Sequence, residues 1–264
     1  FYQPIREAVV HAFQEQPWTP TIDGSYAPAS ALIKGPAKIS RVLSDGDLAL
    51  LTCEQPPLWA ANAPQQNQRE DRFLDSLNIR AWGWSELVNT ISCFEDEEKE
   101  LIESWIAKKD DTWLRQFYAL LGESMDEHYE SVYAEDLRLV RVMDNEGHKH
   151  VIPCEAFFSL EQQSGLGKDI YFVKPEVYKV GRSKRQSEQA ELFLKEAGVR
   201  SYDERAITEL KLQRYKNTDV DIDDEHYKDI QQFIYFLEKN PEEHGLFKNI
   251  LFILSPDSEG DLYW

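Results

Sequence analysis

Apolar residues recur every three or four positions in several stretches of the chain, which is the spacing of one face of an α-helix. A helix with one apolar face packs that face on a core and leaves the other in water. We therefore expect an amphipathic helix in each stretch. The apolar faces consist of Ile5, Val9, Val10 and Phe13; Leu101, Ile102, Trp105 and Ile106; Trp113, Leu114, Phe117, Tyr118 and Leu121; and Tyr227, Ile230, Phe233, Ile234 and Leu237.

One helix-and-turn segment occurs twice in the sequence. Residues 73–82 match residues 193–202 at an offset of 120 positions. In both copies a helix ends on Phe-Leu, the chain turns at Asn78 or Gly198, and a run of apolar residue, Arg and aromatic residue follows. Asn and Gly tolerate the left-handed backbone that commonly ends a helix. A second helix is expected after each copy, at residues 85–91 and 204–215.

Upstream of each matched segment, the sequence predicts a β-hairpin. Thr21–Pro28 and Val142–Pro153 each place an Asp/Gly turn between short extended runs and end at a proline. An apolar tripeptide follows each proline, at residues 31–33 and 156–158. A third hairpin is expected within residues 250–264, where Asp257 and Gly260 separate two apolar runs.

The order of helix, hairpin, proline, variable segment and two helices therefore occurs twice. We interpret the chain as an α+β fold of two tandem repeat units, each a small antiparallel hairpin sheet packed with helices, plus the start of a third unit. The expected units are residues 1–108, 109–239 and 240–264, the last one truncated. Because the sequence begins at Phe1 without Met and stops after an apolar run, we expect a piece of a longer protein. The alternative is two unrelated α+β domains that share only ordinary helix and turn signals.

The chain is strongly acidic, since 48 Asp and Glu against 29 Lys and Arg give a net charge of −19. Such a surface repels phosphate backbones, so nucleic acid is disfavoured as a partner unless a local basic patch exists. With 42% hydrophobic and 12% aromatic residues, the chain has enough apolar surface for a core and lacks the composition of a disordered protein.

Two features bear on location. No apolar run approaches the roughly 18 residues that a membrane span needs, and the N-terminus lacks the basic-then-apolar pattern of a signal peptide. Cys53, Cys93 and Cys154 are widely spaced, odd in number and without a C-x-x-C motif, which favours a reducing cytosol over a disulfide framework. We therefore expect a cytoplasmic protein with no membrane partner.

Two of these motifs together give the chain a family resemblance. The first is the Asp-Gly hairpin with its downstream proline at Thr21–Pro28, and the second is the Phe-Leu step with a following acidic helix at residues 73–86 and 193–204. In these motifs the chain resembles the region behind the ATPase module in sacsin-like, GHKL-type ATP-binding proteins, whose bacterial relatives are large multidomain chains. The resemblance would cover nearly the whole chain, and the motifs that carry it are short.

The resemblance implies a segment of a large protein whose nucleotide-binding domain lies upstream of Phe1. An ATP site of that family needs an Asn-bearing helix, an Asp-x-Gly-x-Gly motif and a glycine-rich lid. Asp23-Gly24 and Asp45-Gly46 lack the following glycines and read as hairpin or turn dipeptides. We therefore carry over no catalytic residue and expect no cofactor in this segment.

Two further stretches of the sequence carry partial motifs for chemistry. Residues 164–169 look like a phosphate loop, but the glycine spacing is wrong and Asp169 follows the lysine, so we expect a flexible loop. His148, His150 and Cys154 could offer a metal three ligands, yet no fourth is near, and a solvated strand is favoured. No Gly-x-Ser-x-Gly elbow or histidine signature for nucleophilic catalysis occurs.

The many carboxylate pairs are expected from the composition. Asp110-Asp111 is one such pair. Asp223-Asp224 with Glu225 and the run Glu95–Glu100 stand where helices are expected to begin, so helix capping is favoured there over a metal-dependent hydrolase. A divergent hydrolase built from unlinked carboxylates remains a third hypothesis, with a pocket of converging carboxylates as its sign. We expect no catalytic and no metal-ligating residues.

A single basic cluster, Arg182-Ser183-Lys184-Arg185, is the candidate for partner binding. It could dock an acidic protein surface or a phosphate backbone, although a mobile linker is favoured for this segment. Trp82 and Trp84 could stack on bases, but Tyr202 in the second copy matches Trp82, which favours a packing role. The candidate partner-binding residues are Arg182, Lys184, Arg185, Trp82 and Trp84.

These observations lead to two hypotheses for function besides the divergent hydrolase. The first is a non-catalytic scaffold or coupling region of a large ATP-driven, chaperone-like or defence protein, whose partners are other domains of that protein or a protein client. The second is a nucleic-acid-handling module of a bacterial defence protein, which the net charge disfavours.

Overall fold

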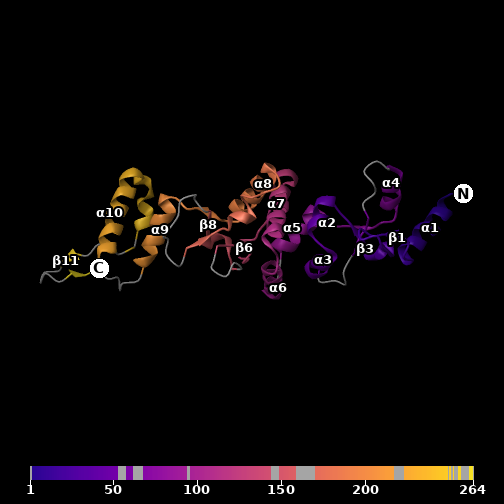
Figure 1. Cartoon of the computed structure of the whole chain (residues 1–264), viewed down its shortest axis with the longest axis horizontal. Coiled ribbons are helices and arrows are strands. Elements are labelled where there is room, and N and C mark those ends of the chain that lie inside the picture. The colour runs from indigo at the N-terminus through magenta and orange to yellow at the C-terminus, as the bar shows by residue number, and fades with distance from the viewer. Residues whose placement is uncertain are drawn as a thin grey trace. The chain divides into compact units, whose positions relative to one another are not determined.

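The computed structural model shows an α+β protein in which small sheets of two or three strands pack with helices (Figure 1). It describes residues 2–52, 58–61, 68–93, 96–143, 149–158, 170–216, 223–248, 250, 252, 255–256 and 262–263. The chain forms two compact units: residues 1–156 with 169–199, and residues 157–168 with 200–264.

The first unit opens with helix α1 (Gln3–Glu15) and an antiparallel hairpin of β1 (Thr19–Pro20) and β2 (Tyr26–Ala27). In the turn of this hairpin, Gly24 has φ +85°, a conformation that suits glycine. A 3-10 turn, η1 (Ala29–Ala31), leads from the hairpin into β3 (Leu32–Lys34). The expected helix and hairpin are both present.

Strand β3 lies at the centre of a parallel three-stranded sheet, between β4 (Leu58–Trp59) and β5 (Arg80–Ala81). Five helices of the described residues belong to the same part of the chain: α2 (Ala37–Val42), α3 (Asp45–Thr52), α4 (Gln68–Ser76), α5 (Trp84–Ser92) and α6 (Asp96–Ala107). Leu32 and Ile33 of β3 are buried, as is Leu48 of α3. After α4 the chain turns at Asn78, whose φ of 53° is the expected left-handed cap.

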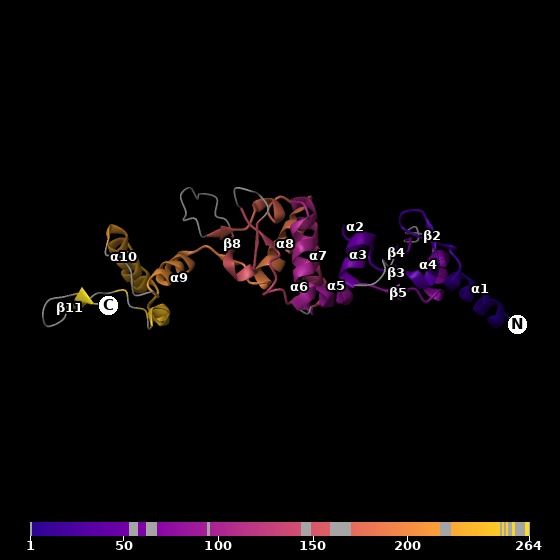
Figure 2. The ribbon, with the colours of Figure 1, turned by 90° about the horizontal axis from the view of Figure 1, so that it is seen from below.

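Helix α7 (Asp111–His128) is the longest and most deeply buried helix among the described residues, with nine buried positions. Its partner is α8 (Lys184–Glu196), which lies beside it in both views (Figures 1 and 2). Between them in sequence come the antiparallel strands β6 (Val140–Arg141) and β7 (His150–Val151), the 3-10 turn η2 (Pro153–Glu155), strand β9 (Tyr171–Phe172) and the 3-10 turn η3 (Pro175–Val177).

The second unit contains β8 (Ala156–Phe158) and β10 (Arg200–Ser201), which pair in parallel. Helices α9 (Glu204–Arg214) and α10 (Asp224–Lys239) follow, then the 3-10 helix η4 (Pro241–Phe247). Leu212, Tyr215 and Phe233 form its core. The antiparallel strands β11 (Ser255–Pro256) and β12 (Leu262–Tyr263) make the third hairpin that the sequence predicts.

Residues 3–92 and 111–214 show the same order of elements: helix, hairpin, 3-10 turn, strand, further strand, helix, strand and helix. The first stretch has α2 and α3 as additions, and the second has η3. The parallel registers correspond as well, since Ile33 pairs with Arg80 and Phe157 pairs with Arg200. This correspondence supports the repeat hypothesis. That the two stretches are duplicates, with boundaries near residues 108 and 239, stays a prediction.

The structure differs from the sequence interpretation at two places. The expected sheets were antiparallel hairpins only, and the parallel pairs of β3 and β8 were missed, because strands of two or three residues carry no measurable alternation. Asp45-Gly46, interpreted as a turn, instead begins α3. Among the described residues, no helix has both the length and the apolar character needed to cross a membrane.

Candidate functional site

A pocket of about 330 Å³ opens in the first unit between α2, α7 and the start of α8. Four of its lining side chains are cations: Lys38 and Arg41 from α2, Arg182 before α8, and Arg185 in the first turn of α8. One carboxylate, Glu123 of α7, also lines it. We call this hollow the basic pocket. Its other polar lining residues are Gln116, Ser183, Gln186 and Gln189.

Local helix geometry places each cation. Lys38 and Arg41 stand three positions apart on α2, so they project from the same face. The Ser183 side chain caps α8 by accepting a hydrogen bond from the Gln186 amide at 3.2 Å, and the Gln186 side chain in turn accepts one from the Arg182 amide at 2.9 Å. This reciprocal cap fixes the backbone that carries Arg182 and Arg185.

Two of the four cations are neutralised by carboxylates of α7. Lys38 pairs with Glu123, whose side chain is only 9% exposed, and Arg185 pairs with Glu127. The Glu127 carboxylate also accepts a hydrogen bond from Gln189 at 3.2 Å. Arg41 and Arg182 form no ion pair with any described residue. The pocket therefore presents two uncompensated guanidinium groups in a chain of net charge −19.

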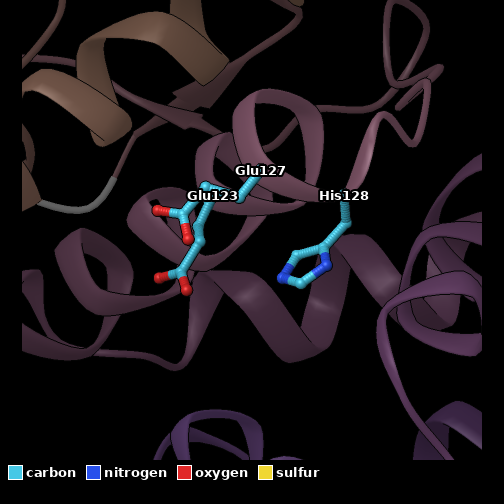
Figure 3. A group of neighbouring side chains, drawn as sticks. All are labelled: Glu123, Glu127 and His128. Carbon is cyan, nitrogen blue, oxygen red and sulfur yellow. The ribbon is translucent and has the colours of Figure 1, made fainter.

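The same carboxylates belong to a possible metal-binding group beside the pocket. Ligand atoms of Glu123, Glu127 and His128 lie within 4.8 Å of one another on α7 (Figure 3). However, both carboxylates already hold a cation, and the His128 ring stacks on Trp84 with centroids 4.5 Å apart. A metal ion would have to displace both ion pairs, so the arrangement favours an anion in the basic pocket over a cation at this cluster.

The structure places the five candidate residues that the sequence predicts in different surroundings. Arg182 and Arg185 line the basic pocket, whereas the Lys184 side chain is 89% exposed, pairs with Glu188 at 3.1 Å and lies outside the lining. Trp82 is buried edge-on against Trp59, with ring centroids 6.0 Å apart. Trp82 therefore has the packing role that the sequence favours. Because Trp82 is buried, it does not form an exposed stacking surface with Trp84.

The favoured interpretation of the basic cluster as a mobile linker is wrong. Lys184 and Arg185 are helical, because the Ser183 cap and the apolar face around Phe193 and Leu194 anchor α8 on α7. Sequence analysis also missed Lys38 and Arg41. Their three-residue spacing was visible, but no sequence signal indicated that α2 and the start of α8 lie at one site.

The other sequence candidates have ordinary surroundings. His150 lies in β7 and accepts a hydrogen bond from the Arg141 side chain at 3.3 Å, and Cys154 is an exposed free thiol. His148 and the loop at residues 164–169 lie outside the described residues. The expected cap role is confirmed for Asp223, which accepts a hydrogen bond from the His226 amide. Asp110 caps α7 in the same way, by accepting a hydrogen bond from the Trp113 amide.

Comparison of the chain with protein-family models, with curated proteins and with solved structures finds no match.

Proposed function

We propose that the chain is a non-catalytic scaffold or coupling region of a large, ATP-driven, sacsin-like protein of the cytoplasm, and that it contacts other domains of that protein or a protein client. The observation that carries this proposal is the tight connection between the start of α7 and the helices that precede it. We call the connecting residues the α7 joint. They are Val42, Asp47, Trp105, Lys109 and Trp113.

The α7 joint ties α2, α3 and α6 to the start of α7. The indole of Trp113 donates a hydrogen bond to the Val42 carbonyl at 2.8 Å, and the indole of Trp105 donates one to the Asp47 carboxylate at 2.7 Å. Lys109 pairs with Asp47 and lies over the Trp113 ring, 4.6 Å from its centroid. Two hydrogen bonds, an ion pair and a cation–π contact therefore fix the position of α7 against the preceding helices.

Burial makes these contacts specific. Asp47 is 6% exposed, and burial by itself would raise its pKa. The hydrogen bonds from Lys109, Trp105 and Ser44 outweigh that effect and hold the pKa of Asp47 below its ordinary value. Three donors that bind one buried carboxylate can keep all of their hydrogen bonds in only one arrangement. Such a fixed connection supports coupling, because a displacement of one side carries the other with it.

Two further features agree with this proposal. The exposed free thiols of Cys93 and Cys154 suit a reducing compartment. The acidic surface would select basic or polar protein partners and would repel polyanions.

The proposal is tested by ATP turnover. We expect the isolated chain to show none, while the parent protein with the joint variant Asp47→Asn keeps its nucleotide affinity and loses the dependence of turnover on client. The exposed variant Asp75→Asn serves as the matched control, because its partner Lys34 lies outside the joint. Steady turnover by the isolated chain would contradict the proposal, as would unchanged client dependence in the joint variant.

A nucleic-acid-handling module is the second candidate, and the basic pocket is the observation that favours it. Its test is a gel shift at low and high salt with single- and double-stranded DNA. A salt-dependent shift that is lost in Arg182→Gln and Arg185→Gln would support this function. The absence of any gel shift at low salt would rule out a nucleic-acid-handling function.

A further inference from the structure

We propose that the basic pocket is a binding site for a phosphate monoester dianion. The inference rests on the pocket alone and is independent of the scaffold proposal. Its basis is that Arg41 and Arg182, which are far apart in the sequence, both line this pocket.

The charge of the pocket matches a dianion. The two ion pairs, Lys38 with Glu123 and Arg185 with Glu127, cancel two positive charges against two negative ones. Arg41 and Arg182 then leave two positive charges. A phosphate monoester carries close to two negative charges at neutral pH, whereas a carboxylate carries one and would leave one guanidinium without a partner.

The donor geometry also suits phosphate. A guanidinium offers paired N–H groups that match the oxygens of phosphate, and bonds between two ionised groups are stronger than neutral ones. Helix α8, which is 13 residues long, begins at the wall of the pocket. The positive end of its dipole adds to the field of the two guanidiniums, as at other anion sites on helix N-termini.

A compact anion fits better than a nucleic-acid strand. A long polyanion would extend beyond the pocket over a surface of a chain with net charge −19, which repels it. A single phosphate group stays within the pocket and interacts mainly with the charges that line it. Carboxylates farther away are screened beyond about 8 Å at physiological salt. Glu123 and Glu127 are held by Lys38 and Arg185, which reduces their repulsion of the bound anion.

The phosphate group could belong to a phosphorylated side chain or to a nucleotide, since both present the same dianion. The test is calorimetric titration of the full chain, at constant ionic strength, with inorganic phosphate, a phosphoserine peptide, its unphosphorylated and aspartate forms, and adenosine monophosphate. We expect inorganic phosphate to bind and one phosphate ester to bind more tightly, which identifies the source. We also expect affinity to rise between about pH 5 and pH 7, as the phosphate loses its second proton.

Arg41→Gln and Arg182→Gln are each expected to weaken phosphate binding about tenfold or more, because each removes a charge-assisted contact. Lys184→Gln is the matched control: it removes the same charge two residues from Arg182, at a side chain outside the pocket. Arg182→Lys is a second variant that keeps the charge and loses the paired donors, and we expect an intermediate affinity.

Three results would overturn the proposal. The first is the absence of binding by every phosphate compound. The second is an equal loss of affinity in Lys184→Gln and Arg182→Gln, which would indicate only diffuse attraction. The third is an aspartate peptide that binds as tightly as the phosphoserine peptide, which would assign the pocket to acidic protein segments.

Discussion

Two buried charges of the first unit, Asp47 and Arg141, are each held by more than one partner. Asp47 accepts hydrogen bonds from Ser44, Trp105 and Lys109. Arg141, 2% exposed, donates to Asp111 at 2.9 Å and to the Lys109 carbonyl at 2.6 Å. Burying a charged side chain without partners costs free energy, so such a side chain stays in the interior only when several hydrogen bonds or ion pairs compensate its charge. These residues therefore determine which arrangement of α3, α6, α7 and β6 is stable.

We predict that Asp47→Asn destabilises the first unit by about 1–3 kcal/mol at pH 7, because Lys109 loses its charged partner while its side chain stays mostly buried. The measurement is urea unfolding. The control Asp75→Asn, at an exposed ion pair with Lys34, should cost less than about 0.5 kcal/mol. Equal losses in both variants would contradict the importance of the buried contact.

The pH dependence of that stability has a defined sign. The pKa of Asp47 is lowered in the folded protein, so the unfolded chain takes up the proton first as the pH falls. The stabilisation is complete above the ordinary pKa and is lost as the pH falls toward the lowered value. We expect the wild type to lose more stability than Asp47→Asn between about pH 5 and pH 3. A wild type and variant that lose the same amount would rule out this linkage.

At residue level, local signals were readable from the sequence and distant partners were not. Asn78 and Gly198 have the positive φ angles that their positions indicated, because a helix end imposes its own backbone geometry. The predicted cap at Asp223 follows from the same local physics. In contrast, nothing near Asp47 in the sequence indicated Trp105 or Lys109, since that contact exists only after α3 and α6 have packed.

The helices of the chain were predictable as elements, and their packing was not. The apolar spacing of α7 indicates a helix, but α8 approaches so closely that a Cβ placed on Gly122 would lie 1.9 Å from the Gln189 carbonyl oxygen. The two backbones therefore meet at Gly122, where any side chain is excluded. Sequence periodicity gives the face of a helix and not the distance of its neighbour.

We predict that Gly122→Ala destabilises the chain by at least about 2 kcal/mol, because α7 and α8 must separate to admit the methyl group. Gly46→Ala is the matched control in another helix, α3, where the nearest atom to an added Cβ is 3.8 Å away. That change should be neutral or stabilise by up to about 1 kcal/mol, from helix propensity. Thermal unfolding of both variants is the measurement, and a harmless Gly122→Ala would show that the helices are not in backbone contact.

At the scale of the whole molecule, average charge and local charge differ in sign. The net charge of −19 disfavours anionic partners, yet the basic pocket gathers four cations around one hollow. Only Arg182 and Arg185 of that site were identified from sequence, because Lys38 and Arg41 reach it through the tertiary contact of α2 with α7. A composition describes the surface on average, whereas a binding site depends on which segments the fold brings together.

The central claim is that the α7 joint makes α6 and α7 one cooperative unit, and native-state hydrogen exchange tests it most directly. We predict that the most protected amides of α6 and α7 share one opening free energy, and that Asp47→Asn lowers both by the same amount. If Asp47→Asn lowers the protection of α6 while α7 keeps its own, the two helices open independently, and a coupling role for the α7 joint is contradicted.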